Sequence, residues 1–209
     1  NTRDQARLRS CQSEPSSMWL RERPNTKTSN DWTDSDFTTA FRYFMGLELC
    51  PAGTKCRHYN GAKRVYCDHY LDKYGGHALH CHVGPHMIAK HAGISRILTD
   101  IFREAGYAVT RERVMPELPV KSRSIRGETV QEVSVLDIHA SMHPRSGNVT
   151  TDVTIRAPVA DHIVKRAARE GGFAATNGQA DKQKRYPSAR GVTVTTAAIE
   201  SFGRLGDEF

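Results

Sequence analysis

The residues best suited to chemistry gather between positions 50 and 91, where four of the five cysteines lie among seven of the ten histidines. Within this segment Cys67, His77 and Cys81 form a Cys-x9-His-x3-Cys unit, with Cys56 upstream as a natural fourth ligand. Thiolate and imidazole donors at such spacings are typical of a structural zinc site, and a closed set of four leaves no position for a substrate. We therefore expect these four side chains to bind Zn2+. The metal would order a Gly-rich segment that has no sustained apolar period.

The identity of the fourth zinc ligand has alternatives in the same segment. Cys50, His69, His82 and His86 carry the same kinds of donor atom and are substitutes for Cys56. Histidines that do not bind the metal are expected to lie at the surface. The odd number of cysteines and their clustering with histidines favour reduced thiols over disulfides.

Aromatic residues interleave with lysines and arginines in this segment, at Tyr59, Tyr66, Tyr70 and Tyr74. Such a composition suits stacking on unpaired bases. Tyrosines in a small metal module also serve as its core, and from sequence alone we favour the core interpretation.

A second group of residues could hold a different metal. Asp137 and Asp152 fall on two neighbouring predicted strands, with fourteen residues between them. Two carboxylates brought close together repel unless a cation lies between them, and Mg2+ with oxygen ligands is the usual solution. Lys182 could neutralise charge on a phosphate, and Tyr186, four residues later, shares its helix face. The alternative is a pair of exposed aspartates and a solvated basic helix.

Hydrophobic periodicity predicts the elements that must position these residues. Apolar residues recur every three or four positions from Ile94 to Ala105, which indicates an amphipathic helix capped by Gly106. The predicted elements are a helix at 37–45, the helix at 94–105, strands at 107–114, 130–139, 149–155 and 191–198, a loop at 115–127, a turn at 145–148, and a helical stretch at 159–186 interrupted by two glycines. This order predicts an α/β fold with one mixed sheet and helices packed on it.

The bulk composition favours a nucleic-acid partner. The formal net charge is +7 and the sequence pI is about 9.3, which favours phosphate backbones. No run of 18 apolar residues occurs, so we expect no membrane span. The polar start at Asn1 leads us to expect a fragment of a longer polypeptide. Basic residues around the predicted loop are candidates for phosphate contacts, namely Arg111, Arg113, Lys121, Arg123 and Arg126.

Short motifs follow one another along the chain in a characteristic order. They are Arg7–Cys11 with Trp19–Leu20, Phe37–Leu49, Gly75–Cys81, His91, Thr151–Thr154, Lys182–Tyr186 and Glu200–Gly203. This series resembles the C-terminal restriction-like endonuclease region of non-LTR retrotransposon reverse transcriptases, over nearly the whole chain. The order of the series is much more specific than any one of its motifs.

The resemblance implies a PD-(D/E)XK fold, a mixed sheet flanked by helices, with a small zinc knuckle. It implies a helical and linker segment at 1–49, the knuckle at 50–91 and the nuclease domain at 92–209. Asp137 stands at the family's first aspartate, Asp152 at its second acid and Lys182 at a lysine relocated to the following helix, with Tyr186 beside it. Thr154 occupies the position where a simple D-x-K motif carries lysine.

The implied activity is nicking of target DNA by an Mg2+-dependent endonuclease, with Mn2+ able to substitute, so that the exposed 3′ end primes reverse transcription. The implied partners are DNA, element RNA and an upstream reverse transcriptase domain of the same polypeptide, in the nucleus. The chain departs from the family pattern at Ser134–Leu136, Ala92 and Val65. An inactive zinc-dependent nucleic-acid-binding module is therefore the alternative, and a zinc module for protein contacts is a third.

Overall fold

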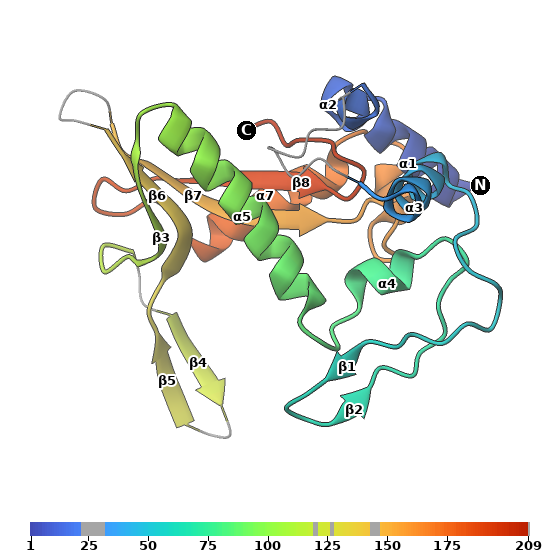
Figure 1. The fold of residues 1–209 in the computed structure, drawn as a ribbon. Helices are drawn as coiled ribbons and strands as arrows, with labels where there is room; N and C mark the ends of the chain where they lie inside the picture. The colour runs from blue at the N-terminus through green and yellow to red at the C-terminus, as the bar shows by residue number, and fades with distance from the viewer. Residues whose placement is uncertain (22–31, 119–120, 126–127, 143–146, 209) are drawn as a thin grey trace. The chain divides into compact units, whose positions relative to one another are not determined.

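The computed structural model describes residues 1–21, 32–118, 121–125, 128–142 and 147–208, with backbone alone at 121–125 and 128–132 (Figure 1). The chain divides into two compact units. Unit 1 comprises Asn1–Lys90, Ala157–Ala174 and Glu200–Arg204. Unit 2 comprises His91–Arg156, Ala175–Ile199 and Leu205–Phe209.

Short helices form the first part of unit 1. They are α1 (Thr2–Cys11), α2 (Glu14–Ser17), the 3-10 turn η1 (Met18–Leu20), α3 (Asp34–Met45) and α6 (Val164–Ala167). In α3 the Thr33 side chain caps the first turn by accepting from the Asp36 N–H, and Gly46 ends the helix in the left-handed conformation at φ 70°. These two residues bound a helix that includes the segment 37–45 predicted to be helical.

Segments far apart in sequence meet within unit 1. Arg9 Nε donates to the Ala168 carbonyl at 2.8 Å, so α1 is tied to the chain that follows α6. The rings of Tyr43 and Phe202 stack with centroids 4.6 Å apart. The Glu200 carboxylate is buried and accepts from the Ala174 N–H at 3.0 Å. The Glu200–Gly203 motif therefore builds the interior of unit 1 rather than an exposed tail.

A four-stranded sheet forms the framework of unit 2, with strand order β3-β6-β7-β8. The strands are β3 (Ala108–Val114), β6 (Val135–Ser141), β7 (Val149–Arg156) and β8 (Val194–Glu200). The β3–β6 and β6–β7 pairs are antiparallel, whereas the arrows of β7 and β8 run the same way in Figure 1, which makes the sheet mixed. The predicted α/β class with a mixed sheet flanked by helices is confirmed.

Two helices pack on the sheet of unit 2 (Figure 1). From His91 onward, α5 (His86–Glu104) places Leu98 against Ile138, Val153 and Ala197. On the other side of β7, α7 (Phe173–Arg185) approaches Thr154, because a Cβ at Gly178 would lie 3.0 Å from Thr154 Cγ2. Neighbouring residues of a strand point to opposite faces, so contacts at 153 and 154 place the two helices on opposite faces of the sheet.

Two local predictions were wrong. The segment 115–127 is not only a loop, because it contains β4 (Lys121–Ile125), which pairs with β5 (Glu128–Glu132) in an antiparallel hairpin. The single strand at 130–139 is in fact divided between β5 and β6, because the first part pairs within the hairpin and the second joins the sheet. Part of the predicted turn at 145–148, and Arg126, lie outside the described residues.

The two predicted glycines separate α6 from α7, as expected for residues 159–186. Within the described ranges, no helix has the length and apolarity that crossing a membrane requires.

Leu136 tests the core at the end of this sheet, where it packs with Met115, Leu118, Tyr186 and Val194 and is 0% exposed. We expect Leu136→Ala to lower the free energy of unfolding by about 2–5 kcal/mol, because the cavity cannot be filled by its neighbours. Urea unfolding monitored by circular dichroism measures this change. Val135→Ala, at a neighbouring position that is 45% exposed, is the control and should change stability by less than about 0.5 kcal/mol. Equal losses in both variants would contradict this packing.

Candidate metal centre and acidic site

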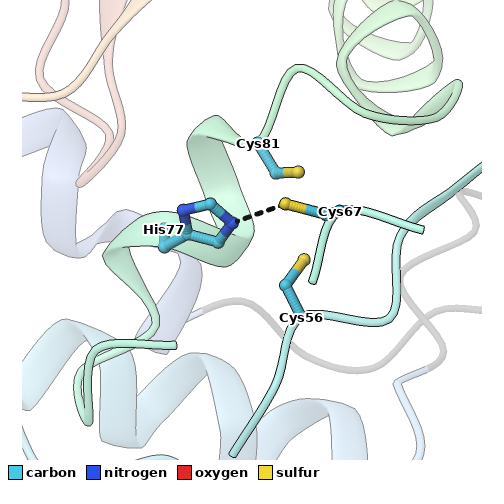
Figure 2. A group of neighbouring side chains, drawn as sticks. All are labelled: Cys56, Cys67, His77 and Cys81. Atoms are coloured by element: carbon cyan, nitrogen blue, oxygen red, sulfur yellow. Dashed lines mark hydrogen bonds between the residues drawn. The ribbon is translucent and has the colours of Figure 1, made fainter. Parts of the chain in front are cut away.

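Three short elements of unit 1 bring the predicted zinc ligands to one point (Figure 2). Cys56 precedes β1 (Tyr59–Asn60), and Cys67 directly follows β2 (Val65–Tyr66). His77 lies in α4 (Gly76–His80), and Cys81 is the residue that follows this helix. In Figure 2 the three sulfur atoms and the imidazole ring point toward a common centre.

The donor atoms of this Cys3His group have the spacing of a metal site. The three sulfurs and one ring nitrogen all lie within 4.8 Å of one another, and Cys67 Sγ is 3.3 Å from His77 Nε2. A tetrahedral zinc ion with Zn–S bonds of about 2.3 Å needs donors about 3.8 Å apart, so small shifts would close the site. Cys56 and Cys81 are buried, which keeps water from two of the ligands. The group can hold a metal ion such as zinc.

Backbone contacts hold these ligands in position. The Cys56 N–H donates to the His69 carbonyl at 2.7 Å, and the Cys67 N–H donates to the His58 carbonyl at 2.9 Å. These bonds tie the two ligand-bearing strands together. The Asp72 carboxylate accepts from the His77 N–H at 2.6 Å and so fixes the first turn of α4. The ligand set is therefore supported by hydrogen bonds as well as by spacing.

The thiols differ in how readily they ionise. A backbone hydrogen bond from His69 lowers the pKa of Cys67 to about 6. Burial raises the pKa of Cys81 to about 11. Zinc binds thiolates, so its binding would displace the proton from Cys81. Burial also raises the pKa of Cys11, outside the cluster, to about 11, which suits a packed residue rather than a nucleophile.

The alternative fourth ligands lie outside the Cys3His group. Cys50 Sγ donates to the Asp72 carbonyl at 3.5 Å, and the His86 ring stacks on the His58 ring with centroids 3.8 Å apart. His69 is nearest, with Nδ1 3.5 Å from Cys67 Sγ, but this nitrogen also lies 3.1 Å from the Cys67 carbonyl oxygen. Among the described residues, the one group with metal-site spacing contains Cys56 as its fourth member.

In unit 2 the predicted acids lie at the end of the β6–β7 ladder. The register pairs Ile138 with Thr151, and its continuation by one residue would place Asp137 opposite Asp152. The ladder ends at the Ile138–Thr151 pair, and the Val153 N–H donates instead to Asp137 Oδ2 at 2.6 Å. His91 Nε2 lies 3.1 Å from the same oxygen. Asp137 is therefore held by both a backbone donor and a side chain of α5.

Electrostatics differ between the two acids. Burial works to raise the pKa of Asp137, but the hydrogen bonds from His91 and the Val153 N–H outweigh it and lower the pKa of this carboxyl. Burial raises the pKa of Asp152, with the negative charge of Asp137 adding to the shift against the pull of Lys182. The hydrogen bond to Asp137 raises the pKa of His91. The two carboxyl groups are thus close enough to interact.

Lys182 of α7 supplies the positive charge that pairs with Asp152. Lys182 Nζ forms an ion pair with Asp152 Oδ2, and the Asp152 side chain is only 4% exposed. Gly178 allows the Lys182–Asp152 contact, because its lack of a side chain lets α7 approach β7 at Thr154. Lys182 lies four residues later on the same helix face. The lysine thus reaches the acid from the helix, while Thr154 lies at the strand position two residues after Asp152.

Tyr186 belongs to the core and lies close to Lys182 of the Lys182–Asp152 pair. It is 6% exposed, its ring centroid is 6.0 Å from Lys182 Nζ, and its hydroxyl donates to the Val135 carbonyl at 3.5 Å. The structure therefore brings together Asp137, Asp152, Lys182 and Tyr186, with Tyr186 as a buried support.

His91 is a site residue that the sequence-based set omitted. The sequence places it at the start of the apolar stripe of α5, three residues before Ile94, and this was the available signal. A histidine on the core-facing side of an amphipathic helix needs a buried polar partner, and here Asp137 and the Val153 carbonyl, 3.3 Å away, meet that need.

Zinc content tests the ligand set directly. We expect about one zinc ion per chain, measured by mass spectrometry of purified protein. Cys56→Ser and His77→Ala should lose the metal, because each removes a donor from a closed site. Cys50→Ser and His69→Ala, at the neighbouring positions outside the group, are the matched controls and should retain it. Loss of zinc in a control variant together with retention in Cys56→Ser would assign the fourth position to another residue.

The ion pair between Lys182 and Asp152 should contribute to the stability of unit 2. We expect Lys182→Ala to destabilise unit 2 by about 3–5 kcal/mol at neutral pH, because it leaves a buried carboxylate without a cation. Adding Asp152→Asn should recover much of this loss, since the neutral amide needs no counter-charge. Urea unfolding of the two single variants and the double variant forms the cycle that measures the coupling. Additive losses would mean that the two side chains do not interact.

No family model matches the chain, and no curated protein matches it. What the metal centre and the acidic site do must therefore be inferred from their own chemistry.

Proposed function

We propose that the chain is a divalent-metal-dependent DNA endonuclease of the PD-(D/E)XK class, acting in the nucleus on behalf of a retroelement. One observation carries the proposal. Acids from two adjacent strands and a lysine from the following helix meet at the end of one mixed sheet. This arrangement can support hydrolysis of a phosphodiester by metal-activated water.

Asp137 and Asp152 are the residues that would hold Mg2+ or Mn2+. Carboxylate oxygens are the donors that these ions prefer, and the ion pairs use the Oδ2 atoms, so each carboxylate has a second oxygen with which to bind a cation. When bound, the ion would lower the pKa of a coordinated water and hold the scissile phosphate.

The remaining site residues have separate roles in this proposal. Lys182 would stabilise negative charge on the phosphate in the transition state, since its ammonium already lies beside the acid pair. Tyr186 supports the lysine from the core. His91 holds the Asp137 carboxylate in place through a 3.1 Å contact and is a positioning residue.

The metal centre of unit 1 would contribute structure rather than chemistry. A Cys3His set has no open position, so a bound zinc would order the knuckle without reacting. The net charge of +7 supports DNA as the partner, because neutralised phosphates release counterions. The nick would expose a 3′ end for an upstream reverse transcriptase domain of the same polypeptide, with element RNA as the template.

A zinc-dependent nucleic-acid-binding module without nuclease activity is the second candidate. It is favoured by the charge balance of the acidic site, where Lys182 and His91 each pair with one carboxylate. Two carboxylates that already have protein cations have a reduced need for a metal ion.

Nicking of supercoiled plasmid by the zinc-loaded chain distinguishes the two candidates. We expect nicking with Mg2+ or Mn2+ but none with EDTA. Asp152→Asn should lower the rate by at least about 100-fold, because the nearly isosteric amide removes the charge that holds the metal. Lys182→Met should also be slow, since it removes the ammonium but keeps the aliphatic stem. Lys184→Ala, an exposed lysine in the last turn of α7, is the matched control and should cut normally.

Circular dichroism and zinc content establish that each variant is folded before its activity is compared. A folded, zinc-loaded wild-type chain that binds DNA without nicking it would reject the nuclease and leave the binding module. Nicking that is unchanged in Asp152→Asn would place the active site elsewhere or reveal a contaminating enzyme.

A further inference from the structure

The strands that carry two of the metal ligands form a longer hairpin than β1 and β2 alone. Tyr59 pairs with Tyr66 and Asn60 pairs with Val65 in antiparallel register. A bridge between Lys55 and Tyr70 continues this register. The hairpin therefore extends across residues 55–70, with its turn between Asn60 and Val65.

Alternation along the first strand separates two faces. Cys56 is 4% exposed and turns toward the metal centre, and His58, two residues later, is half-buried. Lys55, Arg57 and Tyr59 fall at the intervening positions. Residues at alternate positions of a strand point to opposite sides, so these three side chains face away from the metal.

The opposite strand adds two more tyrosines to this outer face, because directly paired residues lie on the same side of a ladder. Tyr66 is 64% exposed and Tyr70 is 66% exposed. The expectation that these tyrosines form the core of the knuckle was therefore wrong for Tyr59, Tyr66 and Tyr70. The metal ligands take the interior of this small hairpin, and the rings are left outside. We call Lys55, Arg57, Tyr59, Tyr66 and Tyr70 the tyrosine face. The same register places one acid, Asp68, on this side, opposite Arg57.

The rings of this face are arranged in contact with one another and with cations. The Tyr59 and Tyr66 ring centroids are 4.8 Å apart, and Lys55 Nζ lies 5.8 Å from the Tyr70 ring centroid. Lys55 also forms a 2.7 Å ion pair with Asp68. Exposed rings of this size with adjacent cations offer both π-faces and charge to a ligand.

The charge of the hairpin is strongly positive. Residues 55–70 contain four basic residues, Lys55, Arg57, Lys63 and Arg64, against the single acid Asp68. The 750 Å3 cleft of unit 1, which Tyr70 also lines, is less basic, because its lining includes the acids Asp72 and Asp161 beside the single arginine Arg3. The tyrosine face is thus the part of the knuckle that suits an anionic ligand.

We propose that the tyrosine face binds single-stranded nucleic acid, with the tyrosine rings stacking on unpaired bases and the flanking lysines and arginines contacting phosphates. Unpaired bases expose the π-surfaces that such rings need, whereas bases within a duplex are already stacked on one another. The cations make the interaction salt-dependent and independent of sequence. This inference goes beyond the proposed nuclease and does not depend on it, because it concerns a surface of unit 1 and no cleavage step.

Equilibrium binding of a fluorescein-labelled oligo-dT strand to the zinc-loaded full chain tests the proposal. Fluorescence anisotropy is measured without added Mg2+, so the result does not depend on nuclease activity. We expect Tyr66→Ala to weaken binding by about 5- to 150-fold, because one stacking ring is lost. Tyr66→Phe should bind nearly as tightly as the wild type, since it keeps the ring. Phe41→Ala removes an exposed ring from α3 and is the control that should not change affinity.

Zinc content is measured for every variant, so a lost metal cannot be mistaken for a lost contact. A duplex of the same length is the competitor, and it should bind more weakly than oligo-dT and be insensitive to Tyr66→Ala. Wild-type affinity for oligo-dT in both Tyr66→Ala and Tyr70→Ala would overturn the proposal. So would an equal loss of affinity for the duplex and the single strand in Tyr66→Ala, which would assign these tyrosines to duplex or general electrostatic binding.

Discussion

A buried negative charge needs a cation close to it. This requirement determines how the acidic site of unit 2 is built. Asp152 is nearly fully buried, and Lys182 pairs with it from α7. Asp137 is less buried but is held by His91 from α5 and by a backbone N–H of β7. Each acid therefore fixes one of the two helices that flank the sheet. The ion pairs position α5 and α7 at the same end of the strands, where the apolar core alone would leave their registers less defined.

Unit 1 is governed by a different constraint, the small apolar interior of its Cys/His segment. Three thiols and an imidazole converge in a hairpin and short helix that contain little apolar interior, so a metal would replace the missing core. The consequence reaches the surface of the module. Because the ligands occupy the inner positions of the hairpin, tyrosines that would otherwise be core residues are exposed beside lysines and arginines. The Cys3His group thereby leaves exposed the surface for which we propose a ligand.

In the function we propose, the two sites have different roles that follow from their donor atoms. The soft Cys3His set is closed, which suits stability and leaves no place for a substrate. The hard carboxylate pair has oxygens beyond those in its ion pairs, which suits a labile divalent ion and a phosphate. Close packing supports the second site, since Gly178 lets α7 approach the strand that carries Asp152. On this proposal, a basic chain with a Cys3His group and an acidic site acts on nucleic acid.

The sequence by itself indicated Cys67, His77 and Cys81 as members of the metal group, the α/β class, the amphipathic helix and two acids on neighbouring strands, because residue type, spacing and periodicity are local properties. Only the tertiary structure decided that Cys56 rather than Cys50 joins the group, that His91 meets Asp137, and that Tyr66 is exposed. It also divided the strand predicted at 130–139, since half of that segment pairs within a hairpin and half within the sheet. Each of these outcomes depends on which distant segment of the chain lies next to a residue. The spacing of residues along the chain does not specify that neighbour.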